Sequence, residues 1–329
     1  MSNRRFVIQA LLTAPWLLAA GCQRQMPGLS KEIIMQKYPM KTYAVGRFLI
    51  DIPDKAVFDG ISVRVYGDDI QRSKYQTLDL PTFVKARIAQ LSSTDASKNK
   101  YVNSFLSVDG RQAVILYTDS PGYKAGGEIE SYVLLGKPGI LYRVDGGYGE
   151  DKKQVAIGFS REVLDLIKPI DDTSFAKSFM GDGYLIAAAD PKYGERAGSG
   201  FTLNGKLTIG FSTHVRQPST EDGLIERTQK ALKMEELAKT TQILRMTKRS
   251  VGANEGEEVA YKNLKGSPGG GTLNFEWDCK GRNQLGAPAM SLNMELQGDP
   301  DQPAVMGDEE ALGLWDTILN SIHLRPGAL

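Results

Sequence analysis

Residues 102–117 read VNSFLSVDGRQAVILY. Two runs suited to β-strands, 102–108 and 112–117, flank Asp109-Gly110, a dipeptide that strongly favours the tight turn of a β-hairpin. A second hairpin is predicted for 128–135 and 140–144, on either side of Gly136-Lys137-Pro138-Gly139. The centre of the first half of the chain is therefore expected to be an antiparallel sheet.

Strands and helices are predicted on both sides of these hairpins. The run 43–52 reads as one strand that ends before Pro53, and 61–66 alternates apolar with polar residues as a half-buried strand does. Pro81 opens a helix, and a second helix is expected after Ser160, which is placed to cap it. The apolar stripes of these two helices are Val84, Ile88 and Leu91, and Val163, Leu166, Ile167 and Ile170.

The second half of the chain repeats this order. Its predicted strands are 184–189, 207–213, 242–249, 257–262, 272–279 and 290–297. A long charged helix to about Lys239 is expected to begin with a capping box of Ser219 and Asp222, and Asp308 is expected to cap the last helix. That last helix has an apolar face made of Ala311, Trp315, Ile318, Leu319 and Ile322.

The matching order suggests an internal duplication, and the alternative is that two coarse assignments match by chance. We expect an α+β fold of two similar domains, 43–172 and 183–326, each a mainly antiparallel sheet with two helices packed on one face. A polar, glycine-containing stretch between Pro169 and Gly183 is the predicted boundary between these domains.

The N-terminus has the pattern of an export signal. Arg4 and Arg5 precede an apolar run, 6–20, and then Leu18-Ala19-Ala20-Gly21-Cys22 resembles the lipobox of bacterial lipoproteins. We expect residues 1–21 to be a signal peptide, Cys22 to be the lipid attachment site, and 22–42 to be a tether. The alternatives are an ordinary cleaved signal with a chance cysteine, or an uncleaved anchor.

The residue after Cys22 bears on location. Gln23, in place of Asp, resembles the sorting pattern for the outer membrane, so the protein is expected on its periplasmic side, anchored through N-terminal acyl chains. Retention at the inner membrane remains an alternative. Residues 3–8, NRRFVI, leave the route open between general and twin-arginine export.

Charge and cysteine content limit the possible functions. The 40 basic and 39 acidic residues nearly balance, which gives no support to nucleic-acid binding. Lipidation of Cys22 would leave Cys279 as the only other cysteine, so no disulfide within the chain is expected and buried cores must supply the stability. The free protein is expected to be monomeric.

Residues for catalysis are scarce. His214 and His323 are the only histidines, and they lack the spacing of a zinc site or a neighbouring nucleophile motif. Cys279 ends an alternating apolar run and is expected to be packed. The carboxylate pairs Asp68-Asp69, Asp171-Asp172 and Glu309-Glu310 are typical of turns and of first helical turns. We therefore expect no enzyme, no metal and no cofactor.

Recognition is the function that the remaining features favour. Three loops interleave aromatic and charged residues, namely 66–75, 143–153 and 299–308, although exposed loops can have this composition without any partner. The candidate partner-binding residues are Tyr66, Asp68, Asp69, Arg72, Tyr75, Arg143, Tyr148, Asp151, Asp299 and Asp301. A crevice between two domains is a further place for a partner.

Residues 45–53, VGRFLIDIP, shortly after a lipobox, resemble the opening of the Tli4-type immunity proteins of type VI secretion. The likeness continues through Gly200-Phe201 to Phe211, which open the second domain, and through the Leu-Trp helix that closes it. The resemblance implies a two-domain periplasmic protein that binds and blocks a cognate phospholipase effector delivered by neighbouring cells, and it brings no catalytic residues.

Two other functions remain open. An envelope lipoprotein that assists assembly or carries a small apolar ligand would contain a roomy apolar cavity inside one domain. An enzyme would bring His214 or His323 together with a serine and a carboxylate in one pocket.

Overall fold

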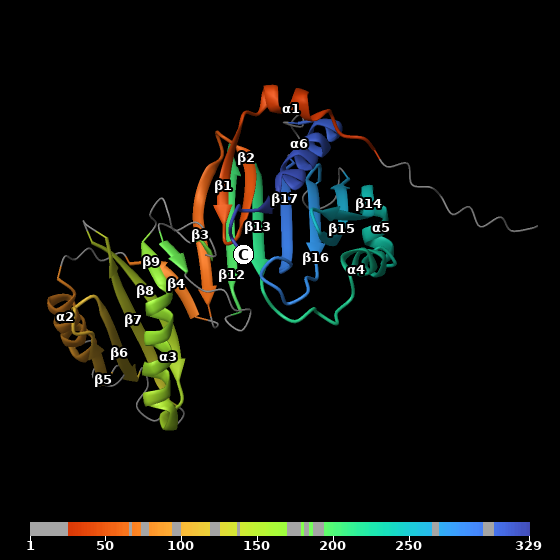
Figure 1. Ribbon diagram of the computed structural model, residues 1–329. Helices are drawn as coiled ribbons and strands as arrows, with labels where there is room; N and C mark the ends of the chain where they lie inside the picture. Colours follow the sequence, from red (N-terminus) through yellow and green to blue (C-terminus); the bar gives the residue numbers. More distant parts are fainter. Residues whose placement is uncertain are drawn as a thin grey trace, which may run out of the picture.

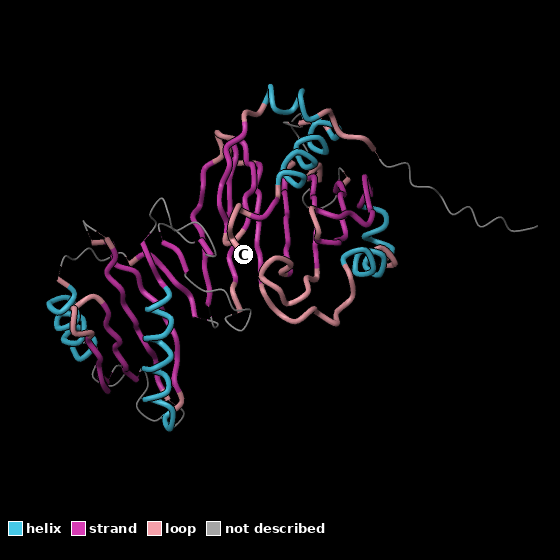
Figure 2. The backbone as a smooth tube through the Cα atoms, in the orientation of Figure 1, coloured by secondary structure: helices cyan, strands magenta, loops and turns pink. Residues whose placement is uncertain are grey.

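The computed structural model describes residues 26–65, 68–73, 79–93, 100–118, 126–136, 139–169, 179–180, 184–186, 194–264, 270–298 and 306–329. Figures 1 and 2 show two lobes joined by one continuous run of strands. The predicted signal peptide and Cys22 lie outside the described residues. In the part of the chain that is described, no helix has both the length and the apolar character needed to cross a membrane.

A twelve-stranded antiparallel sheet forms the framework of both lobes. Its order is β14 (Thr241–Val251), β15 (Asn254–Asn263), β16 (Leu273–Cys279), β17 (Ala289–Leu296), β13 (Leu207–His214), β12 (Arg196–Leu203), β3 (Val57–Val65), β4 (Asp68–Arg72), β8 (Ile140–Tyr148), β7 (Gly127–Leu135), β6 (Gln112–Thr118) and β5 (Lys100–Leu106). Both hairpins of the first half are confirmed, and Gly110 takes φ +65° in the first turn. The α+β class is confirmed as well.

One sheet runs through both halves of the chain, whereas a separate sheet was predicted for each domain. Strand β3 belongs to the first half, yet it pairs with β12 of the second half, with Val63 opposite Ala197. Strand β12 was missed because its glycines and serine, in RAGSGFTL, weaken the strand signal. The predicted duplication therefore does not produce two independent sheets.

The predicted strand 43–52 is a hairpin of β1 (Met40–Val45) and β2 (Phe48–Pro53). Gly46 takes φ +60°, a left-handed conformation that allows the chain to reverse there. With β18 (His323–Leu324), the hairpin forms a small second sheet. A third small sheet contains β9 (Ile167–Pro169), β11 (Tyr184–Ile186) and β10 (Phe179–Met180).

The two helices of the first half lie on opposite faces of the sheet, not on one face. Helix α2 (Leu80–Ser93) packs on the side chains of Ala113 and Ile115. Helix α3 (Lys153–Leu166) shares its core with Val114 and Leu116. Because successive strand residues point to opposite faces, these alternate residues of β6 place the helices on opposite sides.

The second half has the same arrangement. Helix α6 (Asp308–Ser321) contacts Glu258 of β15 through the indole of Trp315, whereas α4 (Leu224–Ala231) begins against Glu257, the neighbouring residue on the other face. The predicted apolar face of α6 is confirmed, since all of its predicted members are at most 3% exposed. The small sheet of β1, β2 and β18 packs on the same side as α6, and its strand β2 contacts that helix.

Three predicted helix starts are wrong. Helix α3 begins at Lys153, so Ser160 lies inside it, and Ile167 already belongs to β9. The long charged helix is two short ones, α4 and α5 (Glu235–Thr240), and Gly223 precedes α4 without a side-chain cap. Gly307 precedes α6, and Asp308 instead binds Lys262 at 2.6 Å. Contacts from β15, which local motifs do not reveal, hold the starts of α4 and α6.

Part of the predicted tether is folded onto the C-terminal lobe. Residues 31–37 form α1 (Lys31–Lys37), which packs on α6 with Ile34 fully buried (Figure 1). Tyr38 donates a hydrogen bond of 2.7 Å to Glu310. The Leu29 amide donates to the Glu309 carbonyl at 2.9 Å. Among the described residues, the packed part of the chain therefore already includes 26–38, well before residue 43.

Candidate functional site

A row of ionisable side chains crosses the large sheet from one lobe to the other, and we call it the charged row. Its members are directly opposite one another on successive strands, in the order Glu130, Asp145, Asp69, Arg64, Arg196 and His214. Directly opposite residues of an antiparallel pair share one face. The row is thus acidic in the N-terminal lobe and basic in the C-terminal lobe, on the face that carries α2.

The acidic end is held by a buried carboxylate. Glu130 is 0% exposed and accepts bonds of 2.8 and 2.6 Å from Arg87 of α2, and 2.7 Å from the hydroxyl of Tyr132. Arg143 lies 3.1 Å from the same carboxylate. Burial alone would raise the pKa of Glu130, but the bonds from Arg87 and Tyr132 and the charge of Arg143 outweigh it, so the pKa is lowered.

The middle of the row consists of two ion pairs, one between neighbouring strands and one within a strand. Arg64 donates two bonds to Asp69, at 2.9 and 2.7 Å, and Arg143 binds Asp145 on its own strand at 2.5 Å. Burial raises the pKa of Asp145, against the opposing effect of Arg143. The structure therefore brings two predicted partner-binding residues, Asp69 and Arg143, into one cluster.

The other predicted residues lie elsewhere. Asp68 points to the opposite face from Asp69, where burial, and next the charge of Asp69, raise its pKa to about 6. Arg72 is exposed at the end of β4, and Asp151 lies in a short 3-10 helix, Glu150–Lys152. Tyr148 is buried, with 7% of its surface exposed, so it offers little contact area. Tyr66, Tyr75, Asp299 and Asp301 lie outside the described residues.

Four basic residues gather at the basic end, and we call them the basic cluster: Arg64, Arg196, His214 and Arg216. Arg196 is directly opposite Arg64 on one side and His214 on the other. Burial, followed by the charges of Arg216, Arg196 and Arg64, lowers the pKa of His214. All three guanidinium groups therefore lie close enough to the imidazole to disfavour its charged form.

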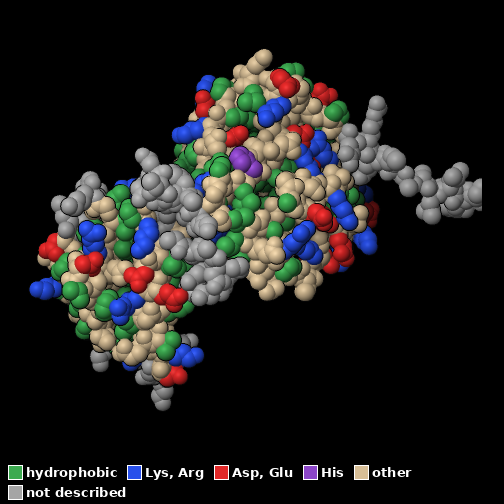
Figure 3. All heavy atoms as spheres, in the orientation of Figure 1, with side chains coloured by type: hydrophobic (Ala, Val, Ile, Leu, Met, Phe, Trp, Pro, Cys, Tyr) green, Lys and Arg blue, Asp and Glu red, His purple; other side chains and the backbone are tan. Residues whose placement is uncertain are grey.

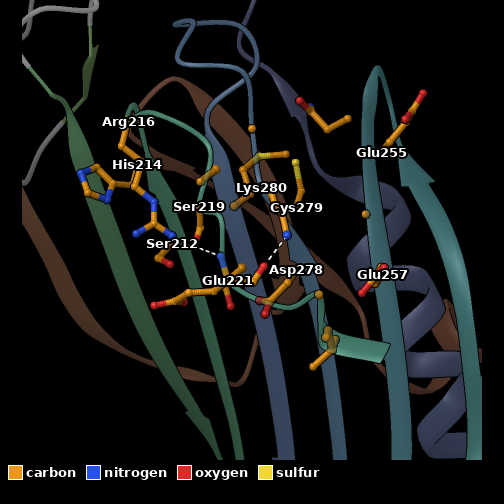
Figure 4. A pocket seen from close by; sticks show the side chains of 18 of the residues that line it. Ser212, His214, Arg216, Ser219, Glu221, Glu255, Glu257, Asp278, Cys279 and Lys280 are labelled. Atoms are coloured by element: carbon orange, nitrogen blue, oxygen red, sulfur yellow. Dashed lines mark hydrogen bonds between the residues drawn. The ribbon is translucent and has the colours of Figure 1, made fainter. Parts of the chain in front are cut away.

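A cavity of about 570 Å³ opens beside the basic cluster. Figure 4 shows His214, Arg216 and Ser212 along one wall, with Glu255 and Glu257 on the opposite wall. Charged and polar side chains dominate the lining, which does not fit the apolar cavity expected of a carrier for a small apolar ligand. The loop before α4 closes one side, where Lys280 binds the Glu221 carbonyl at 2.5 Å.

Several acids of the cavity already have partners. Arg227 binds Asp278 at 2.9 Å, and Lys230 binds Asp222 at 2.5 Å. The carboxylate of Glu257 accepts the Ile225 amide at 2.9 Å at the start of α4.

The histidines do not form a catalytic arrangement within the described part of the chain. His214 shares the cavity with Ser212 and Asp278, but no hydrogen bond joins it to either. His323 is exposed, and its Nδ1 lies 2.6 Å from the carbonyl oxygen of Ser321. Cys279 is buried, which raises the pKa of its thiol. Among the described residues, no three His, Cys, Asp or Glu side chains are grouped closely enough to hold a metal.

Sequence reasoning missed most of the charged row. The strand alternation in 61–66 did place Arg64 on the polar face, but Arg196 lies on the missed strand β12. Glu130 occupies a polar position within one predicted hairpin strand and Asp145 directly follows the other, and these positions were the available signal for them. On the opposite face, which carries α3, acidic and basic side chains are interspersed over both lobes (Figure 3).

These features define a mixed α+β protein with a charged sheet face and no assembled catalytic centre among its described residues. Residues 182–327 match the family described as the Tle cognate immunity protein 4 C-terminal domain. The C-terminal part of the chain therefore belongs to the Tli4-type immunity protein family of type VI secretion. No curated protein matches the sequence significantly.

Two solved structures of immunity proteins resemble this fold over most of the chain. The apo structure of immunity protein TplEi of the type VI secretion system from Pseudomonas aeruginosa is 25% identical, with a TM-score of 0.75 over 89% of this chain and 99% of that chain. A chain of the Tle4–Tli4 complex is also 25% identical, with a TM-score of 0.74 over 87% of this chain and 98% of that chain. Both N- and C-terminal lobes thus have counterparts in these immunity proteins.

Proposed function

We propose that this protein binds and inhibits a cognate phospholipase effector of type VI secretion, and so protects the cell that makes it. The observation that carries the proposal is the family match over residues 182–327, together with the likeness of 87% of the chain to a protein of the Tle4–Tli4 complex. A partner-binding role also agrees with the charged row, whose members from Glu130 to Arg64 are already held by internal ion pairs.

Inhibition would act by covering surface on the effector. A stable complex of this kind buries on the order of 1,600 Å². Ion pairs such as Arg64–Asp69 hold side chains in place before binding, and charge complementarity at an interface mainly favours the correct partner and fast association. The protein would act through contact, without chemistry of its own.

We further propose that the protein acts in the periplasm as a lipoprotein attached through Cys22. The sequence around Cys22 supports this, as does the position where the folded body begins. Met26 lies at the edge of β14, where its carbonyl accepts a bond of 3.3 Å from Arg245. Four residue steps reach at most about 14 Å, so a lipid on Cys22 would hold this edge of the C-terminal lobe close to the membrane.

Inhibition can be tested with purified proteins. The chain without residues 1–22 should form a complex with its paired lipase and suppress phospholipase activity near an equimolar ratio. An unrelated phospholipase provides the control for specificity. A paired lipase that neither binds the protein nor loses activity in its presence would reject the proposed function.

Attachment can be tested separately in cells. Labelling with a fatty-acid analogue should mark the wild-type protein, and the Cys22→Ser variant should remain unlabelled and be released from the membrane fraction. An unlabelled wild-type protein in the cytosol would reject the lipoprotein assignment without touching the inhibitory role.

A further inference from the structure

The basic cluster is an unfavourable arrangement for the isolated fold. Like charges directly opposite each other on neighbouring strands destabilise a sheet, and Arg196 faces Arg64. On its other side Arg196 faces His214, whose charged form the nearby arginines disfavour. Only Arg64 is paired, with Asp69. Within the described ranges, the exposed side chains of Arg196 and Arg216 have no hydrogen bond or ion pair. Such a cluster is suited to an anionic group supplied from outside.

Two further basic side chains line the adjoining cavity. Lys248 and Arg282 line it, are exposed, and lack side-chain partners among the described residues. Asp278 and Asp222 are paired with Arg227 and Lys230, whereas Glu257, which accepts the Ile225 amide, lies directly opposite Lys248 on the neighbouring strand. The remaining acids of the lining, Glu221 and Glu255, are exposed.

The geometry favours an extended ligand over a single small ion. Neighbouring strands lie roughly 4.8 Å apart, so the line from Arg64 through Arg196 to His214 covers roughly 10 Å. The cavity of about 570 Å³ continues from its end toward Lys248 and Arg282. A phosphate would contact one point on this path, whereas a peptide segment with several carboxylates could follow it.

We propose that the basic cluster and the adjoining cavity bind an acidic segment of the protein partner. This inference rests on the proposed function and adds to it the surface and the chemistry of recognition. The arginines beside the acidic half of the charged row are already paired with its carboxylates, whereas Arg196 has no ion pair among the described residues, so the segment would be received on the C-terminal lobe.

The first experiment requires no effector. A fluorescent oligoglutamate peptide is titrated with the full chain lacking residues 1–22, and binding is followed by anisotropy. We expect binding that weakens with added salt, and a loss of affinity of roughly tenfold or more in the double variant Arg196→Glu/Arg216→Glu. The milder Arg196→Gln/Arg216→Gln should lose less. The matched control is Lys168→Glu/Lys233→Glu, which changes the net charge equally at two exposed lysines without ion pairs among the described residues.

Circular dichroism and thermal unfolding of each variant show whether it is folded, and the reversed charges should not destabilise the fold because they relieve the repulsion between Arg196 and Arg64. Retained oligoglutamate affinity in both arginine variants overturns the proposal. Full displacement of the peptide by an equal concentration of inorganic phosphate overturns it too, because the site then binds a small ion. Binding of heparin without binding of oligoglutamate overturns the assignment to a protein segment.

The second experiment uses the paired lipase and the same variants. Weaker capture by Arg196→Glu/Arg216→Glu, with normal capture by the lysine control, supports the proposal. Equal capture by all variants overturns it while the inhibitory function stands. A further outcome is that oligoglutamate binds at the cluster while the wild-type protein captures no lipase. In that case the proposed function fails, and the assignment of this surface to the lipase fails with it. Only the preference of the basic cluster for carboxylates then stands.

Discussion

Arg47 and Glu195 lie 148 positions apart in the sequence and form a buried ion pair with two hydrogen bonds, of 2.8 and 2.6 Å. Arg47 occupies the turn between β1 and β2, and Glu195 immediately precedes β12. The same guanidinium also donates to the carbonyl of Ala328 near the C-terminus. One side chain thus joins the small sheet, the large sheet and the end of the chain.

Removal of one partner of this pair should be strongly destabilising. Arg47→Met leaves the carboxylate of Glu195, which is 1% exposed, without its counter-charge. We expect the free energy of unfolding to fall by about 3–5 kcal/mol, measured by urea denaturation. The double variant Arg47→Met/Glu195→Leu should lose less free energy of unfolding than Arg47→Met, because neither buried charge remains.

A matched control is Arg64→Met, which removes an ion pair whose side chains are 41% and 37% exposed. It should lower stability by about 1 kcal/mol at most. Equal losses in the single and double variants of Arg47 would contradict the role assigned to the buried charge.

A close backbone approach makes Gly313 sensitive to substitution. A Cβ atom there would come within 2.6 Å of the Leu29 carbonyl oxygen, and one on Gly28 within 2.4 Å of the Gly313 amide nitrogen. Gly313→Ala should therefore loosen residues 26–38 from α6 and destabilise the protein by about 1–3 kcal/mol. Limited proteolysis near α1, together with thermal unfolding, measures this effect.

The control for Gly313 is another glycine inside a helix. Gly158 lies in α3, and a Cβ atom there would meet nothing within 4 Å. Gly158→Ala should raise stability by about 0.5–1 kcal/mol because alanine favours the helix. A stabilising Gly313→Ala would show that the N-terminal segment does not pack on α6 as described.

Asp68 should make stability depend on pH. Its pKa in the folded protein, about 6, lies above its ordinary value of 3.8, so the unfolded chain loses this proton first as the pH rises. The stabilisation from the protonated form is complete below about 3.8 and disappears as the pH approaches 6. The side chain of the Asp68→Asn variant stays neutral at every pH. Its free energy of unfolding should therefore exceed that of the wild type by about 1–2 kcal/mol at neutral pH, with allowance for solvent screening, and equal it in acid.

Urea denaturation across this pH range measures the difference. The exposed Asp54→Asn variant controls for the loss of one negative charge elsewhere on the surface. A difference between Asp68→Asn and the wild type that stays constant from acid to neutral pH would contradict the prediction.

Cys279 should react only when the protein unfolds. Its side chain is 6% exposed, and burial raises the pKa of its thiol, so little thiolate is present. In a Cys22→Ser background, iodoacetamide should modify Cys279 slowly in buffer and quickly in urea, as followed by mass spectrometry. Rapid modification of the native protein would place this thiol at the surface.

Local patterns predicted the elements that depend on neighbouring residues. The turn at Asp109-Gly110 and the stripe around Trp315 are of this kind, because a tight turn and a buried helix face are encoded within a few positions. Helix starts at Ser160, Ser219 and Asp308 were predicted from capping motifs, yet α3 begins earlier than Ser160, and the starts of α4 and α6 make contacts with a strand distant in sequence. Glycines in β12 concealed a central strand.

For the candidate site, the sequence placed Asp69 and Arg143 in charged segments but could not place them together. Alternation along a strand determines which face a side chain takes, whereas the choice of neighbouring strand depends on the whole fold. The pairing of β3 with β12 merged the two halves into one sheet and set Arg64 opposite Arg196. The sequence by itself determined the antiparallel hairpins, the helix stripes and the balance of charge. Only the tertiary structure decided the strand register that lines up the charged row, because that register comes from packing between segments far apart in the chain.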